Sequence, residues 1–129
     1  MPTPKDAVWY LRIGQDRVES VIVLTVSGRV SHQTSAELDA ALAKAIASNA
    51  SAVVVDLSAV DYISSPGLRA LERASVTLAG DRRWFAVCGL QDAVSVAFDF
   101  GGLTGTLTVE PSREAAIAAV AAPSGTGDA

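Results

Sequence analysis

The chain has 129 residues, of which half are hydrophobic and 19% are charged. This composition is typical of one globular domain, because a disordered chain carries fewer apolar residues and two ordinary domains need more length. The formal net charge of −4 argues against a nucleic-acid-binding surface. No apolar run approaches the roughly 20 residues of a membrane span, and the N-terminus lacks a signal-peptide core, so we expect a cytoplasmic protein without membrane insertion.

Residues that bind metals or act as nucleophiles are scarce. Cys88 is the only cysteine, so the sequence offers no internal disulfide and no cysteine metal cluster. His32 is the only histidine, and the loop before it has no Cys, His or Asp cluster with metal-ligand spacing. We interpret Cys88 as a core thiol and His32 as a surface residue, and we expect no metal, no cofactor and no catalytic group.

The N-terminal quarter predicts a pair of antiparallel strands. Alternating apolar residues indicate a strand over residues 8–13, followed by a turn over residues 14–16. A second strand is expected over residues 19–27, and a loop over residues 28–32. The side chains expected to share one face of the first strand are those of Trp9, Leu11 and Ile13.

A capping box marks the start of the first helix. Thr34 is followed three residues later by Glu37, as in the pattern S/T-x-x-E, in which each side chain bonds the backbone N–H of the other residue. Apolar residues then recur at helical spacing, and the helix is expected to end near Asn49. The expected inner face consists of Leu38, Ala41, Leu42, Ala45 and Ile46.

The most informative stretch lies in the middle of the chain. A run of three valines predicts a strand over residues 52–57 that is buried on both faces, as in a parallel sheet. Ser65 is a preferred N-cap residue and Pro66 suits the first helical position, so a helix is expected to begin there. Negative charge would be stabilised at that helix N-terminus. The expected inner face is Leu68, Leu71, Ser75, Leu78 and Ala79, with Gly80 as the C-terminal stop.

The C-terminal half continues to alternate strands with helices. We expect a strand over residues 84–88, a helix over residues 90–100 that ends at two glycines, a strand over residues 104–109 and a last helix capped by Ser112. The inward side chains expected for these two helices are Val94, Ala97 and Phe98, and then Ala116, Ile117 and Val120.

The order of these elements predicts an α/β fold. Right-handed crossovers would give a mostly parallel or mixed sheet of about five strands, with about four helices packed against it. We expect one domain over residues 1–122, with its core at about 8–120, and a flexible C-terminal tail over residues 123–129.

Residues 53–71 read Val-Val-Val-Asp-Leu-Ser-Ala-Val-Asp-Tyr-Ile-Ser-Ser-Pro-Gly-Leu-Arg-Ala-Leu. This stretch resembles the signature of the STAS domain, in the family of anti-sigma-factor antagonists. Leu-Thr-Val-Ser-Gly-Arg-Val-Ser over residues 24–31 is similar to the second strand of that family and the loop after it, and Glu-Pro-Ser-Arg-Glu-Ala-Ala over residues 110–116 is similar to the entry of its last helix. The resemblance covers about residues 8–120 and implies the STAS fold.

The resemblance also implies a regulatory binding protein without catalytic activity of its own. Antagonists of this family bind an anti-sigma factor, often itself a serine kinase, and release it once that kinase has phosphorylated them. The acceptor serine lies two residues before a Gly-Leu pair, which implies Ser65, with Ser64 as the alternative acceptor. Two positions that are often acidic in the family carry Ser31 and Ser64 here. The implied partner-binding positions are Ser31, His32, Ser64, Gly67, Arg69 and Glu72.

Other interpretations of the same residues stay open. Ser65 is also explained as a structural helix cap alone. The missing acidic residues favour a constitutive STAS scaffold or accessory subunit, as in a stressosome-like assembly or a lipid-transport ATPase complex. An enzyme or small-ligand binder of the α/β class is a third alternative, although the sequence has neither a dinucleotide-binding glycine pattern nor the residues of a phospho-aspartate receiver. We expect a monomer or weak dimer.

Overall fold

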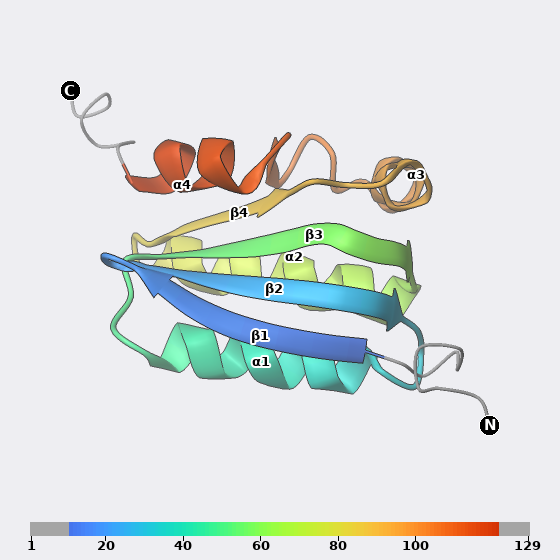
Figure 1. Cartoon of the computed structure of the whole chain (residues 1–129), viewed down its shortest axis with the longest axis horizontal. Helices are drawn as coiled ribbons and strands as arrows, with labels where there is room; N and C mark the ends of the chain where they lie inside the picture. Colours follow the sequence, from blue (N-terminus) through green and yellow to red (C-terminus); the bar gives the residue numbers. More distant parts are fainter. Residues whose placement is uncertain (1–10, 122–129) are drawn as a thin grey trace.

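The structure, a computed structural model, describes residues 11–121. In this part of the chain five strands form one sheet and four helices pack against it (Figure 1). The elements, in chain order, are β1 (Leu11–Val18), β2 (Val21–Val30), α1 (Ser35–Ala47), β3 (Ala52–Ile63), α2 (Ser65–Gly80), β4 (Trp84–Cys88), α3 (Asp92–Gly101), β5 (Thr108–Glu110) and α4 (Arg113–Ala121).

The sheet is mixed and mostly parallel. Its strand order is β1-β2-β3-β4-β5, with β1 antiparallel to β2 and the other neighbours parallel. Helices form the connections between the parallel strands, as parallel pairing requires. The predicted α/β class and the numbers of strands and helices are therefore confirmed.

The turn of the N-terminal hairpin lies further along the chain than the sequence predicts. Gly14 and its neighbours continue β1, where Gly14 pairs with Thr25 of β2. The turn is formed by Glu19, which has a φ of 55°, and the residue after it. The prediction of a turn over residues 14–16 was wrong because β1 is an exposed edge strand, which tolerates glycine and polar residues. Trp9 and the start of the predicted first strand lie outside the described residues.

Two hydrophobic cores lie on opposite faces of the sheet. The larger one is built from β2, β3, β4 and the inner faces of α1, α2 and α3, and the smaller one lies beneath α4 (Figure 1). Val53 and Val55 contribute to the larger core and Val54 to the smaller, and all three are fully buried. The prediction that this strand is buried on both faces is thus confirmed.

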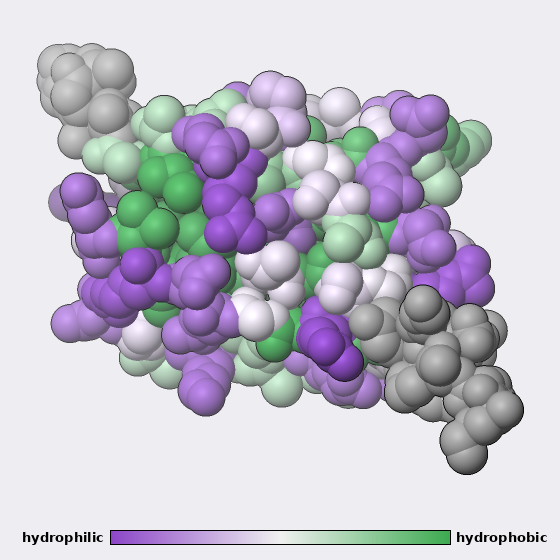
Figure 2. All heavy atoms as spheres, viewed as in Figure 1, coloured by the Kyte–Doolittle hydropathy of each residue, from purple (hydrophilic) through white to green (hydrophobic). Residues whose placement is uncertain are grey.

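The face that carries α4 is mostly polar outside that smaller core. Hydrophilic residues form much of this face, and the widest hydrophobic area lies on the left, where Figure 1 shows α4 and the β1–β2 hairpin (Figure 2). None of the helices in residues 11–121 has the length and apolar character needed to cross a membrane.

The predicted capping box does not form at the start of α1. Thr34 is the N-cap residue, as expected, but its side chain makes no capping hydrogen bond. Its Oγ1 instead accepts a hydrogen bond of 2.8 Å from the N–H of Ser31 and donates one of 2.7 Å to the carbonyl of Arg29. The hydroxyl therefore stabilises the loop before α1, and Glu37 is left exposed.

The inner face of α2 differs in part from the predicted one. Leu68, Leu71 and Leu78 are buried as expected, but Ala79 is exposed. The additional buried positions are Gly67, Ala70 and Ala74. These small residues are covered because α2 packs against α1 as well as against the sheet, so that its buried face is wider than a single stripe.

Several element ends also differ from the predicted ones. β2 and β3 are longer than expected and reach Val30 and Ile63, whereas β5 is shorter and starts only at Thr108. Gly80 is the last residue of α2 and not the residue after it. The predicted Ser112 cap of α4 is confirmed, because its Oγ accepts a hydrogen bond of 3.1 Å from the N–H of Ala115.

Candidate functional site

The candidate site lies where β3 ends and α2 begins. The N–H of Ser64 donates a 2.7 Å hydrogen bond to the carbonyl of Val30, so that the chain turns into the helix next to the end of β2. The Oγ of Ser64 accepts a hydrogen bond of 3.4 Å from the N–H of Gly67, which makes Ser64 the N-cap residue. The side chain is buried, with an exposed fraction of 2% for the residue.

Ser65 is the first residue of α2, so the prediction that Ser65 is the N-cap was wrong by one position. Pro66 correspondingly stands at the second helical position. Ser65 is exposed, and within residues 11–121 no group forms a hydrogen bond with its Oγ. Ser64 therefore makes the capping hydrogen bond that the sequence assigned to Ser65, and Ser65 is left exposed.

Gly67 is buried beneath the ends of β2 and β3. A Cβ atom at this position would lie 2.6 Å from Cγ1 of Val30 and 2.9 Å from Cγ1 of Ile63. Both neighbours are core residues with branched side chains that have little freedom to move aside. Gly67 thus lets the first turn of α2 approach the sheet closely, and it does not present a side chain to a partner.

The loop between β2 and α1 places two more of the expected residues at this end of the sheet. Ser31 is buried, and its Oγ accepts a hydrogen bond of 3.2 Å from the N–H of Thr34. His32, next to it, is exposed. The Ser31 hydroxyl therefore shapes the loop, and His32 is the residue of the two that a partner could contact.

A shallow pocket of about 370 Å³ joins these segments to the C-terminal end of α3. Ser65 and Arg69 line it from α2, and Phe100 lines it from α3. Phe100 is 89% exposed, an unusual exposure for a large apolar side chain next to a polar pocket. The other residues that line the pocket are His32, Tyr62, Ile63, Ser64, Leu68, Ala97 and Gly101.

Arginine side chains supply the charge around this pocket. Arg69 forms an ion pair with Glu72 one turn further along α2. Arg29 lies 3.4 Å from the carboxylate of Asp61, and its guanidinium is 5.3 Å from the centre of the Tyr62 ring. Glu72 does not line the pocket itself and acts there only through Arg69.

A buried ion pair on the opposite face was not predicted. Arg113 at the start of α4 donates a 3.2 Å hydrogen bond to Asp56 at the centre of β3 and one of 2.6 Å to Thr25 Oγ1. Burial acts to raise the pKa of Asp56, but hydrogen bonds from Ser58 and the Arg113 guanidinium outweigh it, so the pKa lies below its usual value. A carboxylate at the end of a valine run was the only sequence signal for this pair.

Cys88 lies at the end of β4 near the same ion pair. Burial raises the pKa of its thiol to about 11, with a smaller contribution from the negative charge of Asp56. This agrees with the interpretation of Cys88 as a core thiol. Within residues 11–121, no three His, Cys, Asp or Glu side chains come together as a metal site would require.

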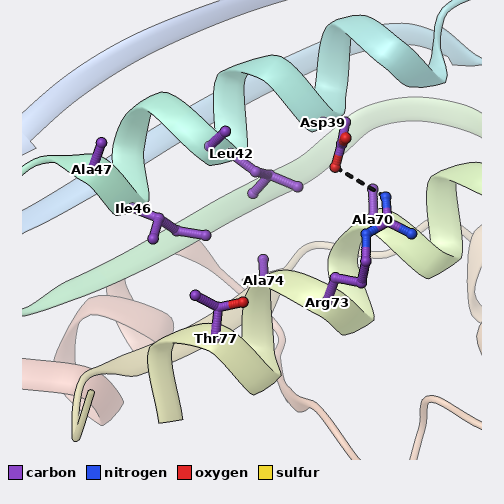
Figure 3. Close-up of a pocket in the computed structure, with 9 residues that line it drawn as sticks. Asp39, Leu42, Ile46, Ala47, Ala70, Arg73, Ala74 and Thr77 are labelled. Atoms are coloured by element: carbon purple, nitrogen blue, oxygen red, sulfur yellow. Dashed lines mark hydrogen bonds and ion pairs between the residues drawn. The ribbon is translucent and has the colours of Figure 1, made fainter. Parts of the chain in front are cut away.

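A second groove, of about 320 Å³, lies between α1 and α2 (Figure 3). Its walls are mostly small or apolar, with Leu42 and Ile46 on α1 facing Ala74 on α2. An ion pair of 3.0 Å between Asp39 and Arg73 crosses it. Helix α2 contributes residues to both this groove and the pocket that contains Ser65, but no single residue lines both.

The sequence and the fold place this chain in a known domain family. The family model of the STAS domain matches residues 13–116, and the chain belongs to that family. A protein of Bordetella bronchiseptica named as an anti-sigma factor antagonist, BtrV, is 30% identical over 109 residues, which cover 84% of this chain and 94% of that protein. The anti-sigma-F factor antagonist RsfB of Mycobacterium tuberculosis is 40% identical over 55 residues, which cover 43% of this chain and 45% of RsfB.

Solved structures agree with this assignment. The crystal structure of an anti-sigma factor antagonist from Mycobacterium paratuberculosis matches with a TM-score of 0.83 and 29% identity, over 89% of this chain and 97% of that one. The unphosphorylated form of the anti-sigma factor antagonist SpoIIAA matches with a TM-score of 0.73 and 19% identity, over 85% of this chain and 96% of that one. At that identity the likeness to SpoIIAA shows a shared fold, and the predicted STAS fold is confirmed.

Proposed function

We propose that this chain is an anti-sigma factor antagonist that binds an anti-sigma factor with serine kinase activity, and that phosphorylation of Ser65 ends this binding. The single observation that carries the proposal is the position of Ser65. It is an exposed residue at the first helical position, while Ser64 is the N-cap residue. Membership of the STAS family and relatives named as antagonists support the choice of partner.

Phosphorylation at this position is compatible with the fold. In the transfer, a bond forms between Ser65 Oγ and the γ-phosphorus of a nucleoside triphosphate, the bond from that phosphorus to the bridging oxygen breaks, and the hydroxyl proton passes to a base of the kinase. The product carries about −1.5 to −2 charge, which the N-terminus of α2 favours. The helix can therefore accept the phosphate without rearrangement.

The effect on a partner is expected to be large. The unmodified surface near Ser65 combines a neutral hydroxyl with the exposed ring of Phe100 and the half-exposed ring of Tyr62. A partner that fits this surface closely would have to desolvate a dianion once Ser65 is modified. Phosphorylation would thus remove complementarity at the centre of the contact.

Affinity capture from a lysate of the native cells tests the proposal. Unmodified protein and Ser65→Ala are expected to retain an anti-sigma factor, identified by mass spectrometry, and Ser65→Glu is expected to lose it. Ser95→Glu is the matched control, because Ser95 is exposed on α3 but does not line the pocket. Undiminished capture of the same partner by Ser65→Glu would contradict the switch.

A constitutive scaffold or accessory subunit is the second candidate. The observation in its favour is that Ser31 and Ser64 occupy positions often acidic in antagonists, and both serines are buried. A scaffold of this kind would bind its partners equally well with Ser65→Ala and with Ser65→Glu. The same capture experiment therefore separates the two candidates.

A further inference from the structure

Ser65 and Arg69 are one helical turn apart on α2. Residues four apart on a helix lie on the same face, at a distance that side chains can span. Both residues line the same pocket of about 370 Å³. A phosphate on Ser65 would therefore stand within reach of the Arg69 guanidinium.

The present contacts of Arg69 tie α2 to the end of α3. Its Nη1 pairs with the carboxylate of Glu72, and its Nη2 donates a 3.0 Å hydrogen bond to the carbonyl of Gly101, the last residue of α3. A Cβ at position 101 would lie 3.3 Å from Nη2 of Arg69 and 3.1 Å from Cδ1 of Leu68. A side chain at position 101 would therefore push the guanidinium and the Leu68 side chain aside by a few tenths of an ångström.

This hydrogen bond bears on the most exposed aromatic side chain of the described residues. Phe100 immediately precedes Gly101, is 89% exposed and lines the same pocket. A guanidinium on the carbonyl of Gly101 also balances the negative end of the α3 dipole. Arg69 therefore adds one hydrogen bond from α2 to the last turn of α3, the turn that carries Phe100.

We propose that Arg69 reads the phosphorylation state of Ser65: it holds Gly101 and Glu72 when Ser65 is unmodified and turns to the phosphate when Ser65 is phosphorylated. The proposal rests on the proposed function, since it takes Ser65 as the acceptor. A phosphate offers a double charge and three acceptor oxygens to the planar fork of the guanidinium. A backbone carbonyl and an exposed carboxylate are weaker acceptors for the same group.

The exchange links the charge at Ser65 to the apolar part of the surface. When Arg69 leaves Gly101, the last turn of α3 loses its hydrogen bond from α2, and the turn that carries Phe100 is less restrained. Phosphorylation then alters the partner surface in two ways, by adding a dianion at Ser65 and by loosening the turn that carries Phe100. Arg69 is accordingly a positioning residue for the switch.

The test uses protein with phosphoserine incorporated at position 65 during translation, so that neither a kinase nor a partner is needed. Phosphorus NMR gives the second pKa of the phosphate, and proton–nitrogen spectra with aromatic proton spectra follow Gly101, Gly102 and the Phe100 ring. We compare the Arg69 protein with Arg69→Gln and with the matched control Arg73→Gln, which removes an equal charge from the same helix. Arg73 pairs with Asp39 and does not line the pocket.

The expected phosphate pKa is lower by about 0.3 units with Arg69 than with Arg69→Gln, and Arg73→Gln leaves it unchanged. His32 and Tyr62 line the same pocket and are constant in this comparison. Phosphorylation is further expected to shift the Gly101, Gly102 and Phe100 signals more strongly in the Arg69 protein than in Arg69→Gln.

Equal phosphate pKa values in Arg69→Gln and Arg73→Gln, or equal signal shifts with and without Arg69, would overturn the inference. Failure of the proposed function is a separate result. If Ser65 is never phosphorylated in native cells, the exchange seen with incorporated phosphoserine still stands as a property of this chain. If Ser65 is phosphorylated in native cells but neither the phosphate pKa nor the Gly101, Gly102 and Phe100 signals depend on Arg69, only the further inference falls.

Discussion

Ser64 and Ser65 are neighbours in the chain but stand in different surroundings. Ser64 is 2% exposed and caps α2, whereas Ser65 is exposed and its hydroxyl is open. Either serine, followed by the proline, fits a helix start, so the sequence alone could not decide which serine is the cap. The position of the cap is set by a contact between distant segments, because the N–H of Ser64 donates a hydrogen bond to the carbonyl of Val30 on β2.

Alanine substitutions are expected to separate the roles of the two serines. Ser64→Ala removes the cap and leaves the N–H of Gly67 without its acceptor, so the free energy of unfolding should fall by about 1 kcal/mol. Ser65→Ala removes an exposed hydroxyl and should change it by less than about 0.5 kcal/mol. Urea unfolding followed by circular dichroism measures both values. Equal losses for the two variants would contradict the assignment of the cap to Ser64.

Gly67 is expected to tolerate no side chain. In Gly67→Ala the new methyl group must displace Val30 and Ile63, and such overpacking typically costs about 1–3 kcal/mol, which exceeds the gain in helix propensity. Gly80→Ala is the matched control on the same helix, because no atom lies within 4 Å of a Cβ there. Urea unfolding should show a loss for Gly67→Ala only. A stability of Gly67→Ala at or above that of the unmodified protein would refute the close packing.

At the scale of whole elements, the ends of β2 and β3 decide where the site lies. Both strands run several residues further than the sequence predicts, and their pairing has irregular steps between Thr25 and Ser27 and between Gly28 and Arg29. Polar residues can continue a strand at such bulges. The polar residues after Leu57 therefore predict a loop, although β3 continues through them. The helices were easier to predict, since their apolar spacing extends over several turns.

The Asp56–Arg113 pair is expected to hold α4 on the sheet. Asp56→Asn leaves a partly buried guanidinium without its carboxylate, and we expect the free energy of unfolding at neutral pH to fall by about 1–3 kcal/mol. Asp81→Asn is the control, because Asp81 forms its ion pair at the surface and should contribute less than about 1 kcal/mol.

The same pair sets a pH dependence. Because the folded-state pKa of Asp56 is lowered below its ordinary 3.8, its carboxylate stabilises the fold fully above that value, and this contribution is lost as the pH falls through the folded-state pKa. The stability difference between unmodified protein and Asp56→Asn should therefore be constant near neutral pH and shrink below about pH 4. Urea unfolding at several pH values measures it. A difference that grows on acidification would contradict the lowered pKa.

At the scale of the molecule, Cys88 is a reporter of unfolding. Its thiol is fully buried in the smaller core, at the end of β4, and burial raises the pKa to about 11. We expect alkylation at mildly alkaline pH to be far slower than for a free thiol and to accelerate with urea in step with global unfolding. Mass spectrometry of the alkylated protein gives the rate. Rapid modification in the absence of urea would show that β4 opens locally.

The fold of the described residues could be predicted to a large extent from the sequence. The valine run of β3, the alternation of strands with helices and the STAS-like signature all pointed to the same α/β architecture. The candidate site was predicted as a region, but not the role of each residue. Gly67 and Ser31 were expected at the surface and are buried, and the contacts of Arg69 with α3 have no local sequence signal because they join residues 32 positions apart.

The central claim is that Ser65 is the residue at which binding is switched. Intact-mass measurement of the protein recovered from its native cells, with fragmentation to locate any phosphate, tests it most directly. We expect one phosphate, on Ser65, that is absent from Ser65→Ala and still present in Ser64→Ala. A protein that stays unmodified across growth and stress conditions, or that carries its phosphate on Ser64, would contradict it.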